Sequence, residues 1–373
     1  MTRQTPKLAR DYYKLGSTRL EVLDTNGNLA EVTITNRSRE SRVETIASRY
    51  KEILETSRVI GAEGYRFEIS EVNRNQTKAA LLHASTYRSS IPTSAGNVAE
   101  LAHRHGSQHT VYVSSFGRGR TSPLENPELR FLAKHGSLLT ATDGEAITLP
   151  VARALLIALE NEGIRICGVR SDSSGRLLTD AFAFALPSDS LTTVFHNSPP
   201  GIGRLGRARL IGKLAYDDFS WSRRLAEKSP DPARVSRAAM REAEHYVRQT
   251  LHTRNSRDDV SISALRMAWA ALLGLAAPAR DIERCPVLRD ARAVASRHPN
   301  ARISFVFGEL DPLSYGLDVG DIGNALRGSM PIGSAAHFCA VLPGMRHNGQ
   351  AAFPSLYGAI EAELLRPVDR APQ

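Results

Sequence analysis

The stretch Ile164-Arg-Ile-Cys-Gly-Val-Arg-Ser-Asp-Ser-Ser-Gly-Arg-Leu-Leu-Thr-Asp-Ala-Phe-Ala-Phe-Ala-Leu186 decides the fold. Residues 164–170 are rich in Ile and Val, which is typical of a buried strand. Residues 176–186 are apolar and helical in pattern. Only residues 171–175 join the two elements, so the chain must turn sharply there. The stretch therefore predicts a strand followed at once by a helix.

The turn itself has the pattern small-x-Ser-x-Gly, with Ser173 at its centre. A serine on a strained strand-to-helix turn needs small neighbours two residues away on each side, and this arrangement is called a nucleophile elbow. The Ser173 hydroxyl would then lie above the N-terminus of the next helix, whose partial positive charge favours a developing anion. Because such a short pattern arises by chance about once in a few hundred residues, an ordinary strand-to-helix turn is the alternative.

Two later segments support the interpretation of Ser173 as a nucleophile. The β-rich run 302–308 leads into Asp311, and the run 337–342 leads into His347. Each of the three residues thus follows a predicted strand, in the chain order Ser, Asp, His. That order is typical of one class of serine enzymes.

In these motifs the chain resembles the α/β-hydrolase superfamily. Gly308-Glu-Leu-Asp311 matches the family's Gly-x-x-Asp, and Pro343-Gly-Met-Arg-His347 matches its Pro-Gly-x-x-His. The Pro/Gly turn that ends Thr192–Gly201 also looks like the family's turn after the strand that follows the elbow. The resemblance covers roughly residues 105–200 and 300–366. Ser171 stands where the family usually has Gly.

The resemblance implies a role for each site residue. Ser173 would be the nucleophile, His347 the base, and Asp311 the acid that orients the imidazole. The backbone N–H groups of Ser174 and Phe116 would form the oxyanion hole. Asp311 precedes Pro312, so its alternative is a turn residue, and Asp318 and Asp321 are the reserve candidates for the acid.

Other chemistries are weighed against this one. Asp172 as nucleophile would make the protein an epoxide or haloalkane hydrolase, but the elbow's closing Gly then falls out of place. The loop Phe116-Gly-Arg-Gly-Arg120 has neither Walker A nor Rossmann spacing, and no carboxylate or Cys completes a metal set with His103, His105 and His109. We therefore expect neither a cofactor nor a metal.

Composition sets further bounds. The 373 residues contain 42% hydrophobic and 23% charged residues, which is ordinary for a soluble globular protein. The net charge is +9, and residues 203–300 hold 19 Lys and Arg against 11 Asp and Glu. This excess would attract an anionic substrate, or it is a solvated helical face. The three cysteines lack metal or redox spacing, and the basic N-terminus lacks an apolar signal core. We expect a cytoplasmic protein without membrane association.

The fold class expected is α/β, with a doubly wound, mostly parallel sheet of the α/β-hydrolase type. Residues 1–108 would be an N-terminal α+β extension whose strands and helix feed the sheet, with a hairpin turning at Asn26-Gly27, a helix over 41–54 and a strand over 65–72. Residues 74–100 are ambiguous. The core would occupy 109–202 and 301–373. Helices over 234–253 and 261–277, without strand patterns, predict an all-helical cap over 203–300, inserted after the sixth strand.

Two functions from different classes follow. The first is a serine hydrolase that cleaves a carboxylic ester or related acyl substrate through an acyl-enzyme, with acyltransferase or peptidase chemistry as lesser alternatives. The second is a non-catalytic protein of the same fold that binds a ligand or partner. The partner expected is a small acyl substrate, which would be anionic if the basic segment lines the pocket. Nucleic acid is not expected, because no aromatic platform is interleaved with the arginines. Homo-oligomerisation is left open.

Overall fold

The computed structural model describes residues 17–24, 29–35, 51–74, 79–84, 108–114, 145–173, 175–199, 286–309, 338–342 and 360–361, together with Asp311, Met345 and His347. All statements below concern these residues.

One sheet organises the described chain. Its ten strands lie in the order β2-β1-β10-β9-β8-β7-β5-β6-β4-β3. The six strands from β10 to β6 in this order are all parallel to their neighbours. They are β5 (Ala80–Ala84), β6 (Thr110–Val113), β7 (Ile166–Asp172), β8 (Thr193–Asn197), β9 (Arg302–Gly308) and β10 (Phe338–Leu342).

Antiparallel strands close both edges of this parallel centre. On one side β4 (Tyr65–Val72) pairs with β6, and β3 (Arg58–Ala62) pairs with β4. On the other side the hairpin of β1 (Ser17–Asp24) and β2 (Leu29–Thr35) adds to β10. The eight strands β3 to β10 form a mixed, mostly parallel sheet that resembles the α/β-hydrolase fold. The hairpin predicted near Asn26-Gly27 is confirmed, and it lies beside β10, the last of the described strands.

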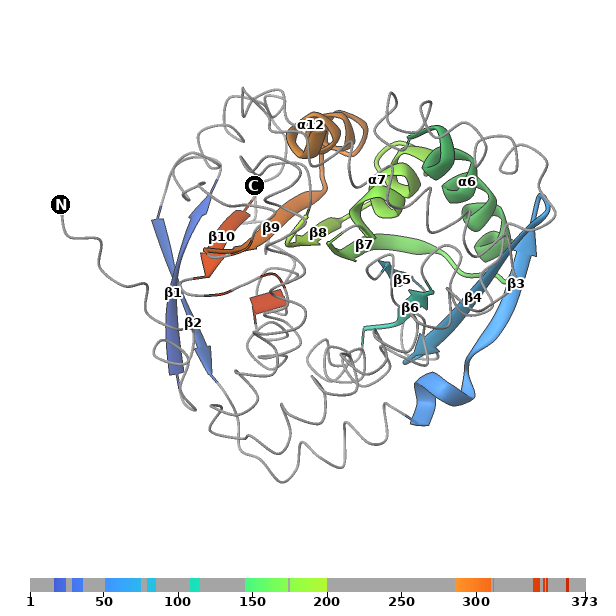
Figure 1. Ribbon diagram of the computed structural model, residues 1–373, viewed down its shortest axis with the longest axis horizontal. Coiled ribbons are helices and arrows are strands. Elements are labelled where there is room, and N and C mark those ends of the chain that lie inside the picture. Colours follow the sequence, from blue (N-terminus) through green and yellow to red (C-terminus); the bar gives the residue numbers. More distant parts are fainter. Residues whose placement is uncertain are drawn as a thin grey trace, which may run out of the picture.

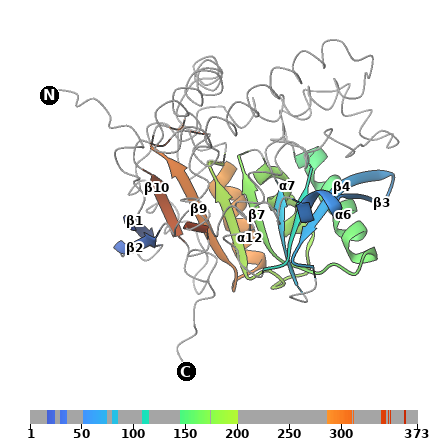
Figure 2. The same cartoon turned by 90° about the horizontal axis from the view of Figure 1, so that it is seen from below.

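Three helices form a layer on one side of the sheet (Figures 1 and 2). They are α6 (Glu145–Asn161), α7 (Gly175–Ala185) and α12 (Pro286–Arg297). Helix α7 packs against both α6 and α12, and it also contacts β5 and β7. Buried apolar residues of these helices and of the strands form one continuous core. The helix that follows the elbow therefore lies in the middle of its layer.

Helix α6 shows how sequence dictates an element and its end. Its buried residues Val151, Ala154, Leu155 and Ala158 recur at helical spacing. The helix ends in a Schellman motif at Gly163, whose φ is +70°. The Gly163 N–H donates to Glu160 O at 2.9 Å, and the next N–H donates to Leu159 O at 2.9 Å. This cap turns the chain directly into β7.

The structure places a strand in a segment that the sequence left ambiguous. The ambiguous segment 74–100 contains β5, which is a central strand of the sheet, paired with both β6 and β7. Strands β3, β4 and β5 all lie within residues 1–108, and all three belong to the sheet. Five residues are too few to establish a period, so Ala80–Ala84 gave no clear signal.

The segment expected as a cap is only partly described. Its last part is α12, whose buried residues Val287, Leu288 and Ala291 belong to the main core. Residues 286–297 thus lie in the helix layer of the sheet. The helices expected over 234–253 and 261–277 lie outside the described residues. The cap remains a prediction.

Candidate active site at the end of strand β7

Ser173 occupies an unusual backbone position directly after β7. Its φ is +49°, in the left-handed region that non-glycine residues rarely adopt. Its N–H donates to Asn197 O at 2.8 Å, and its C=O accepts from Arg176 N–H at 3.2 Å. A positive φ of this kind costs about 1–3 kcal/mol and persists only where surrounding contacts hold it. The turn therefore has the strained geometry that the sequence pattern predicts.

Positive φ by itself does not single out Ser173. Ser198 directly follows the neighbouring strand β8 and has a φ of +47°. The difference lies in what comes next, because α7 begins at Gly175 after Ser173. Only Ser173 thus combines the strained turn with a helix N-terminus, among the described residues.

Sheet topology marks the same place. From β5 the chain moves to β6 on one side, and it then returns to β7 on the other side of β5. Such a reversal is a topological switch point, and in open α/β sheets ligands bind outside the carboxyl ends of the strands at this point. Ser173 follows the carboxyl end of β7, so it stands at the switch point.

The structure brings Asp311 and His347 into contact. The Asp311 carboxylate is fully buried, and its Oδ2 lies 3.1 Å from Nδ1 of His347. The Asp311 N–H donates to Gly308 O at 3.0 Å, so the residue closes the turn at the end of β9. The His347 side chain is 11% exposed. With Nδ1 facing a carboxylate, the tautomer that leaves Nε2 as an acceptor is favoured.

The structure does not describe the remaining predicted residues. Ser174 and Phe116 lie outside the described residues, as do the reserve acids Asp318 and Asp321. The strand order nevertheless changes the basis for Phe116. That residue follows β6, whereas the strand beside β7 is β5, which ends in Leu82-His83-Ala84. The carboxyl end of β5, at Ala84, is therefore the strand end that lies beside the end of β7.

Asp172 is not placed as a nucleophile. Its buried carboxylate accepts hydrogen bonds from Arg170, from Asn197 Nδ2 at 3.0 Å, and is 2.9 Å from His83 Nε2. Burial alone would raise the pKa of Asp172, but the charge of Arg170 and the hydrogen bond with His83 outweigh it and hold the pKa well below its usual range. An attacking carboxylate needs a free oxygen facing substrate, so the epoxide-hydrolase alternative loses its basis.

A second serine, histidine and aspartate set lies on the opposite face of β7. Ser171 Oγ is 2.7 Å from His196 Nδ1, and His196 Nε2 is 3.1 Å from an Asp180 oxygen. Burial would raise the pKa of Asp180, but the charges of His196 and Arg176 hold it low. Ser171 is fully buried and His196 is 1% exposed, so no substrate reaches them. This set joins β7 to β8 and α7.

Sequence reasoning missed all of these polar partners. His83, Arg170, Asn197 and His196 are buried, and they lie at or near the ends of parallel strands. The available signal was their occurrence within otherwise apolar runs, because strands buried on both faces normally read as continuous hydrophobic segments. Within the described part of the chain, no group of three His, Cys, Asp or Glu side chains is arranged to hold a metal ion. No described helix has the length and apolarity needed to cross a membrane.

Comparison with known proteins finds solved structures with a similar arrangement of elements, but it assigns no family. No family model matches the sequence, and no curated protein matches it. Solved structures with a similar layout include an esterase from a Rhodococcus species, at 14% identity and a TM-score of 0.49, covering 84% of this chain and 100% of that one. An α/β-hydrolase fold protein from Chitinophaga pinensis has 12% identity and a TM-score of 0.48, with coverages of 84% and 98%. At these values the likeness says nothing about substrate or chemistry.

Proposed function

We propose that the chain is a serine hydrolase in which Ser173, His347 and Asp311 form the catalytic triad. The observation that carries the proposal is the Asp311–His347 hydrogen bond. It lies at the carboxyl end of the parallel strands, where Ser173 also takes its positive φ. All three residues follow carboxyl ends of parallel strands. The ends of β7 and β9, which Ser173 and Asp311 follow, are two strand positions apart, about 10 Å, and His347 contacts Asp311.

Each residue then has one chemical task. Nε2 of His347 removes the proton of the Ser173 hydroxyl, whose oxygen attacks the carbonyl carbon of an ester or related acyl substrate. Asp311 holds the imidazole and stabilises the imidazolium that forms. The alcohol leaves with the proton from His347. Water, activated by the same base, releases the acid and restores Ser173.

The oxyanion needs two N–H donors. Ser174 would supply one, since it follows the nucleophile and precedes the first residue of α7. For the second donor, Phe116 is the residue expected from the sequence, and the end of β5 at Ala84 is the strand end that lies beside β7. A small carboxylic ester is the substrate class proposed, and the basic excess over residues 203–300 favours an anionic one.

The test is covalent labelling with a fluorophosphonate probe, read by intact mass. In this reaction the Ser173 oxygen forms a bond to phosphorus, fluoride leaves, and the serine proton passes to His347. We expect one adduct on the wild type and none on Ser173→Ala. The matched control is Ser198→Ala, which replaces the other positive-φ serine that follows a parallel strand and should keep the adduct. An unlabelled, folded wild type would favour the alternative of a non-catalytic binding protein.

A further inference from the structure

The last three residues of β7 are polar, although the strand is buried on both faces. Arg170, Ser171 and Asp172 have exposures of 0%, 0% and 3%. Side chains alternate along a strand, so Arg170 and Asp172 share one face and Ser171 points to the other, where α7 lies. Burying charged groups is costly unless each one is paired. A buried strand therefore tolerates these polar side chains only because specific partners satisfy their charges and hydrogen-bonding groups.

Arg170 is the centre of the face opposite α7. Its Nη2 donates to Asp172 Oδ1 at 2.9 Å and to Glu361 Oε1 at 2.6 Å, and its Nε donates to Glu361 Oε2 at 2.7 Å. The Glu361 contact is bidentate, which fixes the plane of the guanidinium as well as its position. The Arg170 and Glu361 side chains are both 0% exposed. The guanidinium thus clamps two carboxylates that are distant in sequence.

Two further contacts make Asp172 a junction between strand ends. His83 comes from the end of β5, Asn197 from the end of β8, and both are cross-strand neighbours of this part of β7. Arg170 also contacts the His83 ring. Asp172 immediately precedes Ser173, so every restraint on Asp172 acts one peptide unit away from the proposed nucleophile.

Glu361 follows the proposed base, His347, in the sequence. It lies 14 residues after His347, beyond the last strand β10. The Arg170–Glu361 pair therefore ties the C-terminal segment, which carries the proposed base, to the strand that carries the proposed nucleophile. The buried guanidinium thus contacts both the residue that precedes Ser173 and a residue 14 positions after His347.

We propose that Arg170 and Glu361 are positioning residues, which hold the Ser173 turn and the His347 segment in mutual register through the Arg170–Asp172 and Arg170–Glu361 contacts. The inference rests on the proposed function, because it concerns the reactivity of Ser173. It adds residues that touch no substrate and act through Asp172 and the C-terminal segment. Misplacement of reacting groups by about 1 Å is enough to slow a reaction about 100-fold.

The test is the second-order rate constant for fluorophosphonate labelling of Glu361→Gln, measured per folded molecule. Gln keeps the shape of Glu361 but removes the charge that fixes the guanidinium plane. We expect labelling to slow about 10-fold or more, and we expect kcat to fall while KM for an ester changes little. Glu361→Asp keeps the charge and should recover part of the rate, and it serves as the second variant if Glu361→Gln folds poorly.

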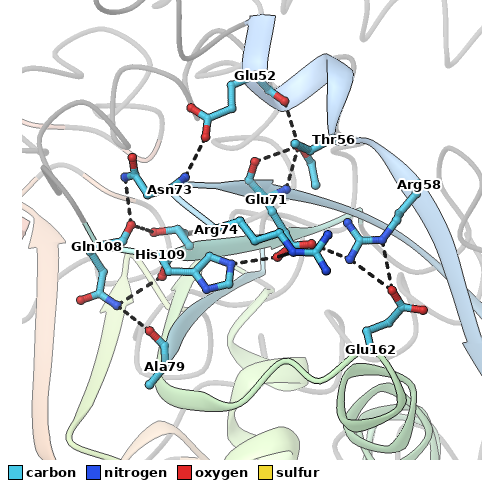
Figure 3. A network of polar contacts seen from close by, with 12 residues as sticks. Glu52, Thr56, Arg58, Glu71, Asn73, Arg74, Ala79, Gln108, His109 and Glu162 are labelled. Atoms are coloured by element: carbon cyan, nitrogen blue, oxygen red, sulfur yellow. Dashed lines mark hydrogen bonds and ion pairs between the residues drawn. The ribbon is translucent and has the colours of Figure 1, made fainter. Parts of the chain in front are cut away.

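The matched control is Glu71→Gln, which removes another buried carboxylate paired with arginine, near β3 and far from β7 in the strand order (Figure 3). This variant should lose stability and keep the wild-type labelling rate per folded molecule. If Glu361→Gln behaves like Glu71→Gln, the Arg170–Glu361 pair is only structural and the inference is overturned. If the wild type itself is unlabelled at Ser173, the proposed function fails first and the positioning role with it.

Discussion

Two buried carboxylates in this protein have similar surroundings and different places in the fold. Asp172 is bound by Arg170, His83 and Asn197 at the end of β7. Glu71 is bound by His109 at 2.9 Å and Arg58 at 2.5 Å, and Arg74 lies 3.7 Å away (Figure 3). Each carboxylate has a pKa held below its usual range, because its partners outweigh the effect of burial.

Their positions in the sheet separate them. Asp172 is the last residue of β7, next to a serine with positive φ at the switch point. Glu71 lies on the antiparallel strand β4, and its partner His109 comes just before β6 begins, at the amino end of the parallel strands. The Glu71 cluster links β4 to β3 and, through Arg58, to Glu162 after α6.

The comparison teaches that a carboxylate, histidine and arginine cluster does not by itself identify a functional site. Side-chain chemistry and pKa direction are shared by the two clusters. What differs is the backbone: strand direction, the switch point and the strained turn occur together only beside Asp172, within the described residues. The predictions below test whether this difference in place is a difference in function.

The largest effect is expected at Asp311. Asp311→Asn keeps the size of the side chain but donates or accepts through an amide, so it no longer favours the tautomer in which Nε2 is unprotonated. We expect the fluorophosphonate labelling rate to fall about 1,000-fold or more, with the fold kept. The second-order rate constant of labelling measures the loss of reactivity, and circular dichroism checks that the fold is kept. A loss below about 10-fold would mean that Asp311 is a turn residue and not the acid.

The next effect is on stability in acid, and it is carried by His83. Burial, followed by the charge of Arg170, lowers the His83 pKa to about 4. The ordinary pKa of a histidine is about 6.5. As pH falls from 6.5 towards 4, the unfolded chain therefore binds a proton at His83 that the folded chain does not bind. Folding therefore loses up to about 3 kcal/mol over this window.

His83→Gln removes this contribution, so the variant should lose less stability than the wild type between pH 7 and pH 4.5. Urea unfolding at both pH values gives the difference. Identical losses in the two proteins would show that His83 is not held neutral beside Asp172, and the electrostatic part of the comparison would then fail.

A smaller loss of stability is expected at the other cluster. Glu71→Gln leaves Arg58 and Arg74 without their shared carboxylate, but these side chains are 28% and 55% exposed, so water compensates part of the charge. We expect a loss of about 2 kcal/mol in the free energy of unfolding. Urea denaturation measures it. A slower labelling of Ser173 in the folded variant would erase the functional distinction between the two clusters.

The smallest effect is expected at Gly163, which belongs to neither cluster. An added Cβ there meets no atom within 4 Å, so only its φ of +70° opposes the change. Gly163→Ala should cost about 1 kcal/mol of stability and leave labelling unchanged. Thermal unfolding together with the labelling rate provides the check. It calibrates how far a mild destabilisation alone affects Ser173 reactivity, and a slowed rate would weaken every comparison made by labelling.

Much of the fold was predictable from local sequence. The strands ending near Asp172, Gly308 and Leu342, and helices α6 and α7, have enough apolar residues at the right period to be recognised alone. The strand β5 was missed because it is short. The cap and the domain boundaries stay predictions, since most of residues 203–300 lie outside the described residues.

For the candidate site, local sequence determined the strained turn at Ser173, because only small residues permit it, and the chain order of Ser173, Asp311 and His347. Tertiary structure decided what those residues meet. It brought His347 to Asp311 across 36 positions of sequence, and Glu361 to Arg170 across 191. It also placed β5, rather than β6, beside β7. The physical reason is that strand order and side-chain contacts arise from packing distant segments into one core, and no short stretch of chain carries that information.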